Sequence, residues 1–431
     1  METKKGKFFN RGVHFDDKKY LAKDIPIEIL DAPESVAISL AQHIGKPADA
    51  VVAVGDKVLQ GQLIGKSSGF VSANVYSSVS GEVTAIEKKP NQRGQLSAHI
   101  VIKNDGLYTF SPLPSMPDKQ PATIIARVQE AGIVGLGGAG FPTAVKLSPK
   151  TAVDTLIING AECEPYLTCD FRLMIEKTNE VVQGIRLLAK ALKLTTILVG
   201  IEDNKPEAIA LFEKFDDIQV VVLKKRYPMG SEKHLIYSCT GRKVPCGKLP
   251  SDVGCVVQNI ATAFAVFDAV ELNKPLFERT LTVSGENVKT PKNLLVKFGT
   301  NFSYIFEKCS LDENDLAMLI CGGPMMGSTL IGRDFYTKKT DSGLLALNKS
   351  TVALSNPTPC INCGACAKAC PMQLMPMTID FYTQAGDWAS ADKFGGVMNC
   401  IECGSCAFVC PAKRALIQSI TLCKAKLREK K

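Results

Sequence analysis

The chain is poor in aromatic residues, and its positive charge is not gathered in one place. Phe, Trp and Tyr make up 7% of the 431 residues, and the formal net charge is +8. Nucleic-acid surfaces usually combine clustered basic residues with aromatic side chains that stack on bases. Here the basic residues are dispersed and few aromatics lie among them, so no nucleic-acid partner is expected.

The chain also lacks a hydrophobic segment that is long enough to cross a membrane. Its most apolar stretch, residues 256–272, falls short of the roughly 20 residues that a membrane-spanning helix needs, and Gln258, Asn259 and Asp268 interrupt it. The N-terminal sequence METKKGKFFNRG has no apolar core of a signal peptide. We therefore expect a cytoplasmic protein, or one that partner proteins hold at a membrane.

Cysteine, in contrast, is abundant, with 16 residues in the chain. The segment CINCGACAKACP begins at Cys360, and a near copy, CIECGSCAFVCP, begins at Cys400. Both have the spacing C-x2-C-x2-C-x3-C-P, which is typical of ferredoxins with two [4Fe–4S] clusters. Three cysteines on one tight loop can bind three irons of a cluster, whereas the fourth lies too far around and binds the other cluster.

This spacing predicts which cysteines share a cluster. The expected ligands are Cys360, Cys363, Cys366 and Cys410 for the first cluster, and Cys370, Cys400, Cys403 and Cys406 for the second. A zinc site is the alternative, but zinc sites usually pair C-x2-C units across a longer gap. The other eight cysteines show no comparable spacing, and we expect them to be buried thiols.

The N-terminal part of the chain, residues 1–112, contains short apolar runs bounded by Gly and Asp, which indicates a β-rich module. The stretch VGDKVLQGQLIGKSSGF and the later run VYSSVSG resemble biotinyl and lipoyl carrier domains, which are barrel-sandwich hybrids. Phe70 stands where those domains carry the modified lysine, and a phenyl ring has no amine to acylate. We therefore expect an unmodified module that serves in docking.

From residue 113 onward the pattern alternates between strands and helices. The runs TLIING, TTILVG and IQVVVL are short and apolar, as buried parallel strands are, and amphipathic stretches lie between them. This predicts an α/β domain with a parallel sheet over residues 113–274. A small α+β module is expected over residues 275–349, and residues 350–431 hold both cysteine motifs and a basic tail.

A glycine-rich segment, GIVGLGGAGFPTAVKL, occupies residues 132–147. Its glycines precede a Pro-Thr pair that can begin a helix, and such a loop exposes backbone N–H groups to which phosphate can bind. Lys146 would add a counter-charge. The segment matches neither the G-x-G-x-x-G nor the Walker A pattern. The residues alone therefore indicate a phosphate site without identifying its ligand.

Four motifs of the α/β region resemble the NADH-binding flavoprotein subunit of respiratory complex I. The run GGAGFPTAVK resembles the flavin loop of that family, and NGAECEP resembles its Asn-Ala-Asp-Glu-x-Glu-Pro run. The run YPMGSEKHL resembles its Tyr-x-x-Gly-Glu-Glu-x-x-Leu run, and VVQNIAT resembles its Asn-containing helix start. The resemblance implies that FMN binds on the glycine loop and that NADH stacks over it.

The same resemblance implies roles for individual residues. It places Gly135, Gly137, Gly138 and Lys146 at the FMN phosphate, Asn159, Tyr227, Gly230 and Asn259 along the flavin, Phe141 against NADH, and Glu162, Glu164 and Glu232 near the flavin and the nicotinamide. The alternatives are a core position for Phe141 and a solvated loop for the first two glutamates. Leu136, Ala161 and Ser231 replace an arginine, an aspartate and a glutamate of that family, and these changes concern the NADH contacts.

The order of the modules resembles the RnfC family, whose members are subunits of the Rnf electron-transport complex, an NAD:ferredoxin oxidoreductase. An RnfC protein joins a barrel-sandwich hybrid, an α/β FMN/NADH domain, an SLBB-like β-grasp module and a ferredoxin-like domain with two [4Fe–4S] clusters. The resemblance implies a peripheral subunit at the cytoplasmic face of the inner membrane. Its implied partners are the membrane and iron–sulfur subunits of that complex, and ferredoxin is an indirect one.

The implied activity is hydride exchange between NADH and FMN, followed by single-electron transfer through the two clusters. Partner subunits would couple this transfer to ion translocation, because the chain itself shows no membrane span. Two alternatives are a cobalamin reductase of a bacterial microcompartment and a non-catalytic iron–sulfur relay or docking subunit. The first would use the same NADH-to-flavin chemistry, and the second predicts full iron and sulfide content without flavin affinity.

Overall fold

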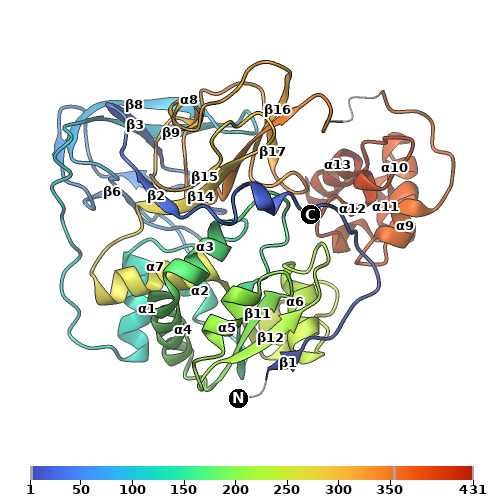
Figure 1. Cartoon of the computed structure of the whole chain (residues 1–431), viewed down its shortest axis with the longest axis horizontal. Coiled ribbons are helices and arrows are strands. Elements are labelled where there is room, and N and C mark those ends of the chain that lie inside the picture. Colours follow the sequence, from blue (N-terminus) through green and yellow to red (C-terminus); the bar gives the residue numbers. More distant parts are fainter. Residues whose placement is uncertain (1–2, 353–355, 430–431) are drawn as a thin grey trace.

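The computed structural model describes residues 3–352 and 356–429, which form four β-sheets and a helical region near the C-terminal end (Figure 1). In Figure 1 the α/β region occupies the lower part of the molecule, and the two β-rich regions lie above it. The helices that carry the cysteine motifs stand to one side of both. A mixed α/β architecture with several modules was expected from the sequence, and the structure confirms it.

The α/β region is built on a five-stranded parallel sheet with the order β1-β12-β11-β10-β13. Helices α1, α4 and α7 contribute to the apolar core on one face, and α6 packs against the other face. The three predicted strands are therefore confirmed. The sequence did not predict β13 as a separate strand, because it runs directly into the apolar helix α7. The elements are α1 (Pro121–Glu130), α2 (Thr143–Lys146), β10 (Thr155–Gly160), α3 (Cys169–Glu176), α4 (Thr178–Leu192), β11 (Thr196–Glu202), α5 (Pro206–Phe212), β12 (Gln219–Leu223), α6 (Glu232–Thr240), η2 (Pro250–Val253), β13 (Cys255–Asn259) and α7 (Ile260–Glu271).

The N-terminal segment joins regions that are far apart in the sequence. Strand β1 (Lys4–Lys5) pairs with β12, whereas β2 (Ile27–Leu30) pairs with β15 of a different sheet, and η1 (Lys19–Leu21) lies between them. Figure 1 shows this dark blue segment passing close to the C-terminal helices. This arrangement differs from the prediction that residues 1–112 form one module, because the two strands complete sheets built by later parts of the chain.

The β-rich region after this segment consists of two antiparallel sheets, β3-β9-β8-β5 and β4-β6-β7. Val36, Ile38, Ile64 and Ile102 are fully buried between them. Phe70 lies between β6 and β7 and is 80% exposed. The strands are β3 (Ser35–Ser39), β4 (Asp49–Ala50), β5 (Lys57–Val58), β6 (Leu63–Lys66), β7 (Val75–Tyr76), β8 (Gly81–Pro90) and β9 (Leu96–Asn104).

The third region is a six-stranded mixed sheet with the order β17-β16-β18-β14-β15-β2. Helix α8 buries Phe302, Ile305 and Phe306 against it. The predicted α+β composition of this region is therefore observed. The elements are β14 (Glu278–Ser284), β15 (Lys292–Lys297), α8 (Phe302–Lys308), β16 (Leu316–Cys321), β17 (Ser328–Leu330) and β18 (Gly343–Asn348).

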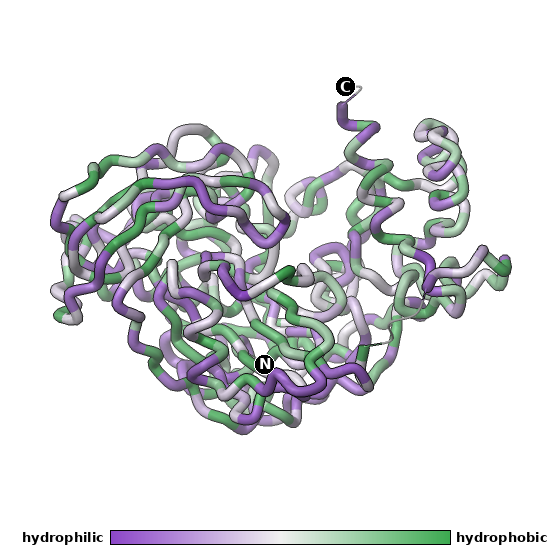
Figure 2. The backbone as a smooth tube through the Cα atoms, turned by 90° about the horizontal axis from the view of Figure 1, so that it is seen from above, coloured by the Kyte–Doolittle hydropathy of each residue, from purple (hydrophilic) through white to green (hydrophobic). Residues whose placement is uncertain are grey.

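The C-terminal region is helical and carries both cysteine motifs. Its core includes Ile379, Val397, Leu416 and Ile420 together with several cysteines. Figure 2 shows that the end of α13 is hydrophilic, and no helix of the described residues is long and apolar enough to cross a membrane. The elements are α9 (Ala365–Ala369), α10 (Pro376–Gln384), α11 (Trp388–Gly395), η3 (Val397–Asn399), α12 (Ser405–Phe408) and α13 (Leu416–Glu429).

The eight cysteines outside the two motifs are mostly buried, as expected. Cys163 is half-buried, and the expectation is wrong for Cys246, which is exposed. Cys246 lies in an irregular segment before η2, where no helix or sheet covers it. The buried cysteines are Cys169, Cys239, Cys255, Cys309, Cys321 and Cys423.

Candidate functional site

Three of the four flavoprotein-like motifs meet at the carboxyl edge of the parallel sheet, where such sheets bind ligands. Asn159 and Asn259 are register partners on the neighbouring strands β10 and β13. The Asn159 side chain donates to the Gly230 carbonyl at 2.9 Å. The Asn259 side chain caps α7 by accepting from the Ala261 N–H at 2.8 Å, and it donates to Asp170 at 2.6 Å.

The glycine loop lies directly beside this edge. The Gly135 N–H donates to the Phe141 carbonyl at 2.9 Å, which closes the loop, and the half-buried Phe141 stands at its base. Gly137 and Gly138 at the tip are exposed. A Cβ on Gly137 would lie 2.7 Å from the Asn259 amide nitrogen, whereas a Cβ on Gly138 would have nothing within 4 Å. The tip therefore leaves room for a ligand against its backbone.

Lys146 and Glu232, which the sequence predicted to contact the FMN phosphate and the nicotinamide region, form an ion pair with each other. The Lys146 Nζ lies 2.8 Å from the Glu232 carboxylate and 3.3 Å from the Val257 carbonyl. The two side chains are 31% and 39% exposed. An exposed ion pair of this kind contributes little to stability, so the lysine remains available to a phosphate at the loop.

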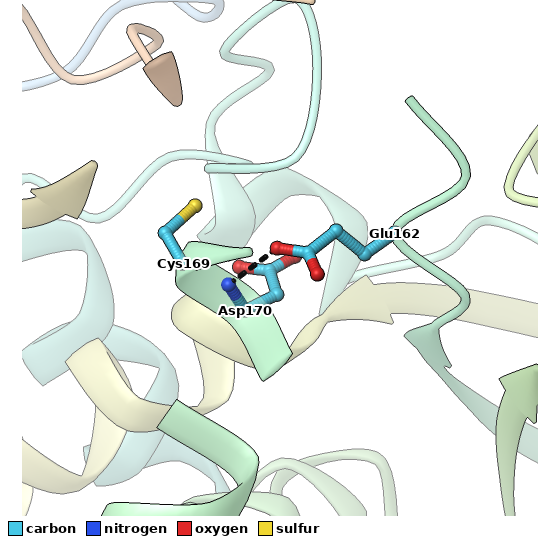
Figure 3. A group of neighbouring side chains, drawn as sticks. All are labelled: Glu162, Cys169 and Asp170. Carbon is cyan, nitrogen blue, oxygen red and sulfur yellow. Dashed lines mark hydrogen bonds between the residues drawn. The ribbon is translucent and has the colours of Figure 1, made fainter. Parts of the chain in front are cut away.

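Glu162 is a buried carboxylate beside the two asparagines. Its side chain is 5% exposed, and it accepts from the Asp170 N–H at 2.7 Å (Figure 3). Lys19 of the N-terminal segment lies 3.7 Å away, and the second carboxylate oxygen has no hydrogen-bond partner. Burial raises the pKa of Glu162 to about 7, although the Lys19 charge opposes that rise. Cys169 completes the group drawn in Figure 3.

Glu164 turns toward the third region. Its carboxylate accepts from the Met325 N–H at 3.1 Å, and burial raises its pKa to about 7. Lys19 donates to the backbone carbonyls of Glu164 and Leu167. The carboxylates of Glu162 and Glu164 are thus buried, and Lys19 binds the backbone of the loop that carries them. This excludes the alternative that the loop is exposed to solvent.

Tyr227 links the α/β region to the cysteine motifs. It is 2% exposed, and its hydroxyl donates to the Cys403 carbonyl at 2.7 Å. Val13 and Ala369 belong to the same apolar cluster. The sequence placed Tyr227 along the flavin, whereas the structure directs its hydroxyl toward the second cysteine motif, because the C-terminal region packs against this loop.

Thiols of each cysteine motif lie close enough to the other motif to affect its pKa values. Burial raises the pKa of Cys366, and the nearby Cys410 thiol raises it further. Burial also raises the pKa values of the three thiols Cys400, Cys403 and Cys406, and Cys370 from the other motif adds to each. The sharing of cluster ligands between the two motifs stays a prediction. Cys360 and Cys363 are exposed.

Sequence reasoning missed several residues of this region. Lys19 precedes the site by more than a hundred residues, and Asp170 lies in the first turn of α3 without a recognisable motif. The Cys163 thiol accepts from the Gly230 N–H at 3.3 Å. Only Cys163 carried a usable signal, because it lies between the two glutamates of a motif that was already identified.

Three protein-family models match separate parts of the chain. The RnfC barrel sandwich hybrid domain matches residues 7–107, and the Nuo51 FMN-binding domain matches residues 128–268. A 4Fe-4S dicluster domain matches residues 353–411. The predicted flavoprotein-like and two-cluster regions are therefore confirmed at the level of the family.

Three relatives resemble the chain over nearly its whole length, and each is the C subunit of its complex. The relative from the proton-translocating ferredoxin:NAD(+) oxidoreductase complex of Clostridium ljungdahlii is 45% identical, covering 98% of this chain and 94% of the relative. The relative from the Na(+)-translocating complex of Acetobacterium woodii is 40% identical, with 99% and 98% covered. The relative from the ion-translocating oxidoreductase complex of Rhodobacter capsulatus is 43% identical, with 97% and 83% covered. The chain therefore belongs to the RnfC family, the C subunits of the ion-translocating ferredoxin:NAD+ oxidoreductase complexes known as Rnf complexes.

Proposed function

We propose that this chain exchanges hydride between NADH and FMN within a ferredoxin:NAD+ oxidoreductase complex and relays single electrons through two [4Fe–4S] clusters. The observation that carries the proposal is the hydrogen bond from Tyr227 to the Cys403 carbonyl, because it joins the flavin-type edge to a cluster loop. The relatives named for this activity support it over a cobalamin reductase. We infer that its partners are other subunits of that complex, that ferredoxin is an indirect partner, and that it lies at the cytoplasmic face of the membrane.

The residues at the carboxyl edge fit FMN. The exposed backbone at Gly137 and Gly138 would receive the phosphate, with Gly135 shaping the loop and Lys146 supplying charge. Asn159, Gly230 and Asn259 would border the ring. FMN, when bound, accepts two electrons as a hydride and returns them one at a time.

The acidic residues nearby would orient the nucleotide. Carboxylates can bind an amide or ribose of NADH through charge-assisted hydrogen bonds. One Glu162 carboxylate oxygen has no hydrogen bond within the described residues and lies 3.7 Å from the Lys19 Nζ. Glu232 is free to exchange its ion pair with Lys146 for such a contact. Phe141 would supply an aromatic face. Glu164 and Tyr227 would act from the side that faces the clusters.

The eight motif cysteines fit two [4Fe–4S] clusters with exchanged fourth ligands. Support comes from the proximity of Cys410 to Cys366 and of Cys370 to the second motif. The third region, with its mixed sheet and single helix α8, is proposed to be the SLBB-like β-grasp module. The four modules would then divide near residues 112, 274 and 349.

An anaerobic spectroscopic titration tests the proposed function. NADH is added to cluster-replete protein with FMN, and absorbance is followed at flavin and cluster wavelengths. The expected result is bleaching of the flavin followed by bleaching of the clusters. Protein that holds iron and sulfide but binds no FMN, and shows no bleaching, would instead be a relay or docking subunit.

A further inference from the structure

In the described part of the chain, two buried cations of the third region have no carboxylate within ion-pair distance. Arg279 on β14 is 4% exposed, and Lys339, which precedes β18, is fully buried. Among the described residues, neither forms an ion pair with a carboxylate. Arg279 interacts electrostatically with the buried Asp170 and Asp341 without touching either, and burial lowers the pKa of Lys339 to about 7. Burying a cation without a carboxylate in contact is costly, so the presence of two such cations at one place calls for an explanation.

Both cations bind the glycine loop through its backbone carbonyls. The Lys339 Nζ donates to the Gly132 carbonyl at 2.7 Å and to the Asn74 carbonyl at 2.6 Å. The Arg279 Nη1 donates to the Leu136 carbonyl at 3.0 Å and to the Lys339 carbonyl at 2.6 Å. The third region thus holds a loop that belongs to the α/β region.

These contacts determine which way the loop presents its polar groups. The carbonyls at Gly132 and Leu136 turn inward to the cations, and the Leu136 N–H donates to the buried Thr262 hydroxyl at 3.0 Å. Gly137 and Gly138 directly after this anchor stay exposed. Successive backbone N–H groups in a turn can form an anion-binding concavity, and the exposed glycines after the anchor leave their backbone accessible to such a ligand.

We propose that Arg279 and Lys339 are positioning residues for phosphate binding at the glycine loop. They hold the loop by its carbonyls and place positive charge behind it, which a bound phosphate dianion compensates and stabilises. The proposal rests on the proposed function in so far as the phosphate is that of FMN. It assigns the third region a task in cofactor binding, although that region contributes no residue to the predicted FMN contacts.

The test compares FMN with riboflavin, which has the same ring but no phosphate. Affinities of both are measured by fluorescence titration for wild type, Arg279→Met and Lys339→Met. FMN affinity is expected to fall by about tenfold or more in each variant, as for the loss of a charge-assisted contact. Riboflavin affinity should change by less than about twofold, because that ligand does not engage the loop charge.

Two further variants separate positioning from general destabilisation. Arg279→Lys keeps the charge but loses the planar fork, so its FMN affinity should lie between those of wild type and Arg279→Met. Lys297→Met removes another largely buried cation of the same sheet, whose ion pair is with Glu278, and it should bind FMN as wild type does. If Lys339→Met does not fold, the FMN affinity of Arg279→Lys, compared with those of wild type and Arg279→Met, tests the proposal.

Unchanged FMN affinity in Arg279→Met and Lys339→Met would overturn the proposal, and so would an equal loss of riboflavin affinity. If wild type binds neither flavin, the proposed function fails. Amide hydrogen exchange then tests only whether the two cations hold the glycine loop. The Gly135 and Leu136 amides should exchange faster in Arg279→Met than in Lys297→Met. Equal exchange in these two variants would show that the cations do not hold the loop.

Discussion

At the scale of single residues, the site depends on groups whose ordinary solution behaviour is changed by burial. Glu162 keeps one carboxylate oxygen without a hydrogen bond inside the protein. Gly137 and Gly138 differ from each other in what surrounds them, since only the first lies against Asn259. These differences lead to two measurable expectations.

Glu162→Gln should change how stability depends on pH. Burial raises the folded-state pKa of Glu162 from 4.5 to about 7. Between these values the unfolded chain ionises while the folded chain stays protonated, so rising pH favours unfolding by up to about 1.4 kcal/mol per pH unit. Glutamine does not titrate, and the variant should therefore gain stability relative to wild type as pH rises through this window. Urea unfolding at pH 5 and pH 8 measures the difference, and a constant difference would contradict the prediction.

Gly138→Ala and Gly137→Ala should affect different properties. A Cβ on Gly138 meets no protein atom within 4 Å, so protein stability should be unchanged. FMN affinity should fall, because the methyl group would occupy the place proposed for the phosphate. A Cβ on Gly137 displaces Asn259, the cap of α7, which should cost about 1 kcal/mol of stability. Thermal unfolding and FMN titration measure the two effects. Gly332→Ala, at another open glycine, is the control and should change neither.

At the scale of elements, the two cysteine motifs act as one unit. Each motif is a short loop followed by a short helix, α9 or α12, and a fourth cysteine past that helix. Helices α9 and α12 pack together, which is what the proposed pairing of Cys370 with the second loop and of Cys410 with the first requires. Neither motif is therefore expected to complete a cluster by itself.

Cys370→Ser should remove the cluster of the other motif. If ligands are exchanged, the reduced variant should show the same residual electron paramagnetic resonance spectrum as Cys403→Ser, and a different one from Cys363→Ser. Thiolate is the ligand that iron–sulfur clusters use, so serine weakens the site it replaces. A spectrum of Cys370→Ser that matches Cys363→Ser would mean that each motif closes its own cluster.

At the scale of the whole molecule, the N-terminal segment and Tyr227 connect the flavin-type edge to the cluster region. The Gly12 N–H donates to the Ala369 carbonyl at 3.0 Å, and the Val13 N–H donates to the Tyr227 carbonyl at 2.9 Å. Phe15 lies against both Tyr227 and Phe408, with ring centroids 5.6 and 5.8 Å apart. The N-terminal segment, whose strand β1 belongs to the sheet of the α/β region, thus also contacts the cluster region.

Tyr227→Phe should slow electron transfer between these regions without affecting hydride exchange. The variant loses the hydrogen bond to Cys403 and leaves a buried carbonyl without its donor, which costs about 1–3 kcal/mol and loosens the contact. Rapid mixing with NADH should show flavin bleaching at the wild-type rate and slower cluster bleaching. Tyr166→Phe removes a similar buried hydroxyl that bonds Glu286, and it should leave both rates unchanged.

The features that the sequence predicted are local ones. The cysteine spacing, the strands β10, β11 and β12, the glycine loop and the helix start at Asn259 each lie within a short stretch. Their physical causes, namely ligand spacing, alternation of burial, and capping, act between residues that are close along the chain. Such features need no knowledge of which distant segments come together.

Only the tertiary structure decided the surroundings of those features. Lys19 beneath the Glu162 loop, Arg279 and Lys339 behind the glycine loop, and the Tyr227 contact to Cys403 all join segments far apart in sequence. Strands β1 and β2 pair with sheets formed by much later residues. A buried lysine or an edge strand has the same local pattern whichever partner it meets, so its partner is determined only when the core assembles.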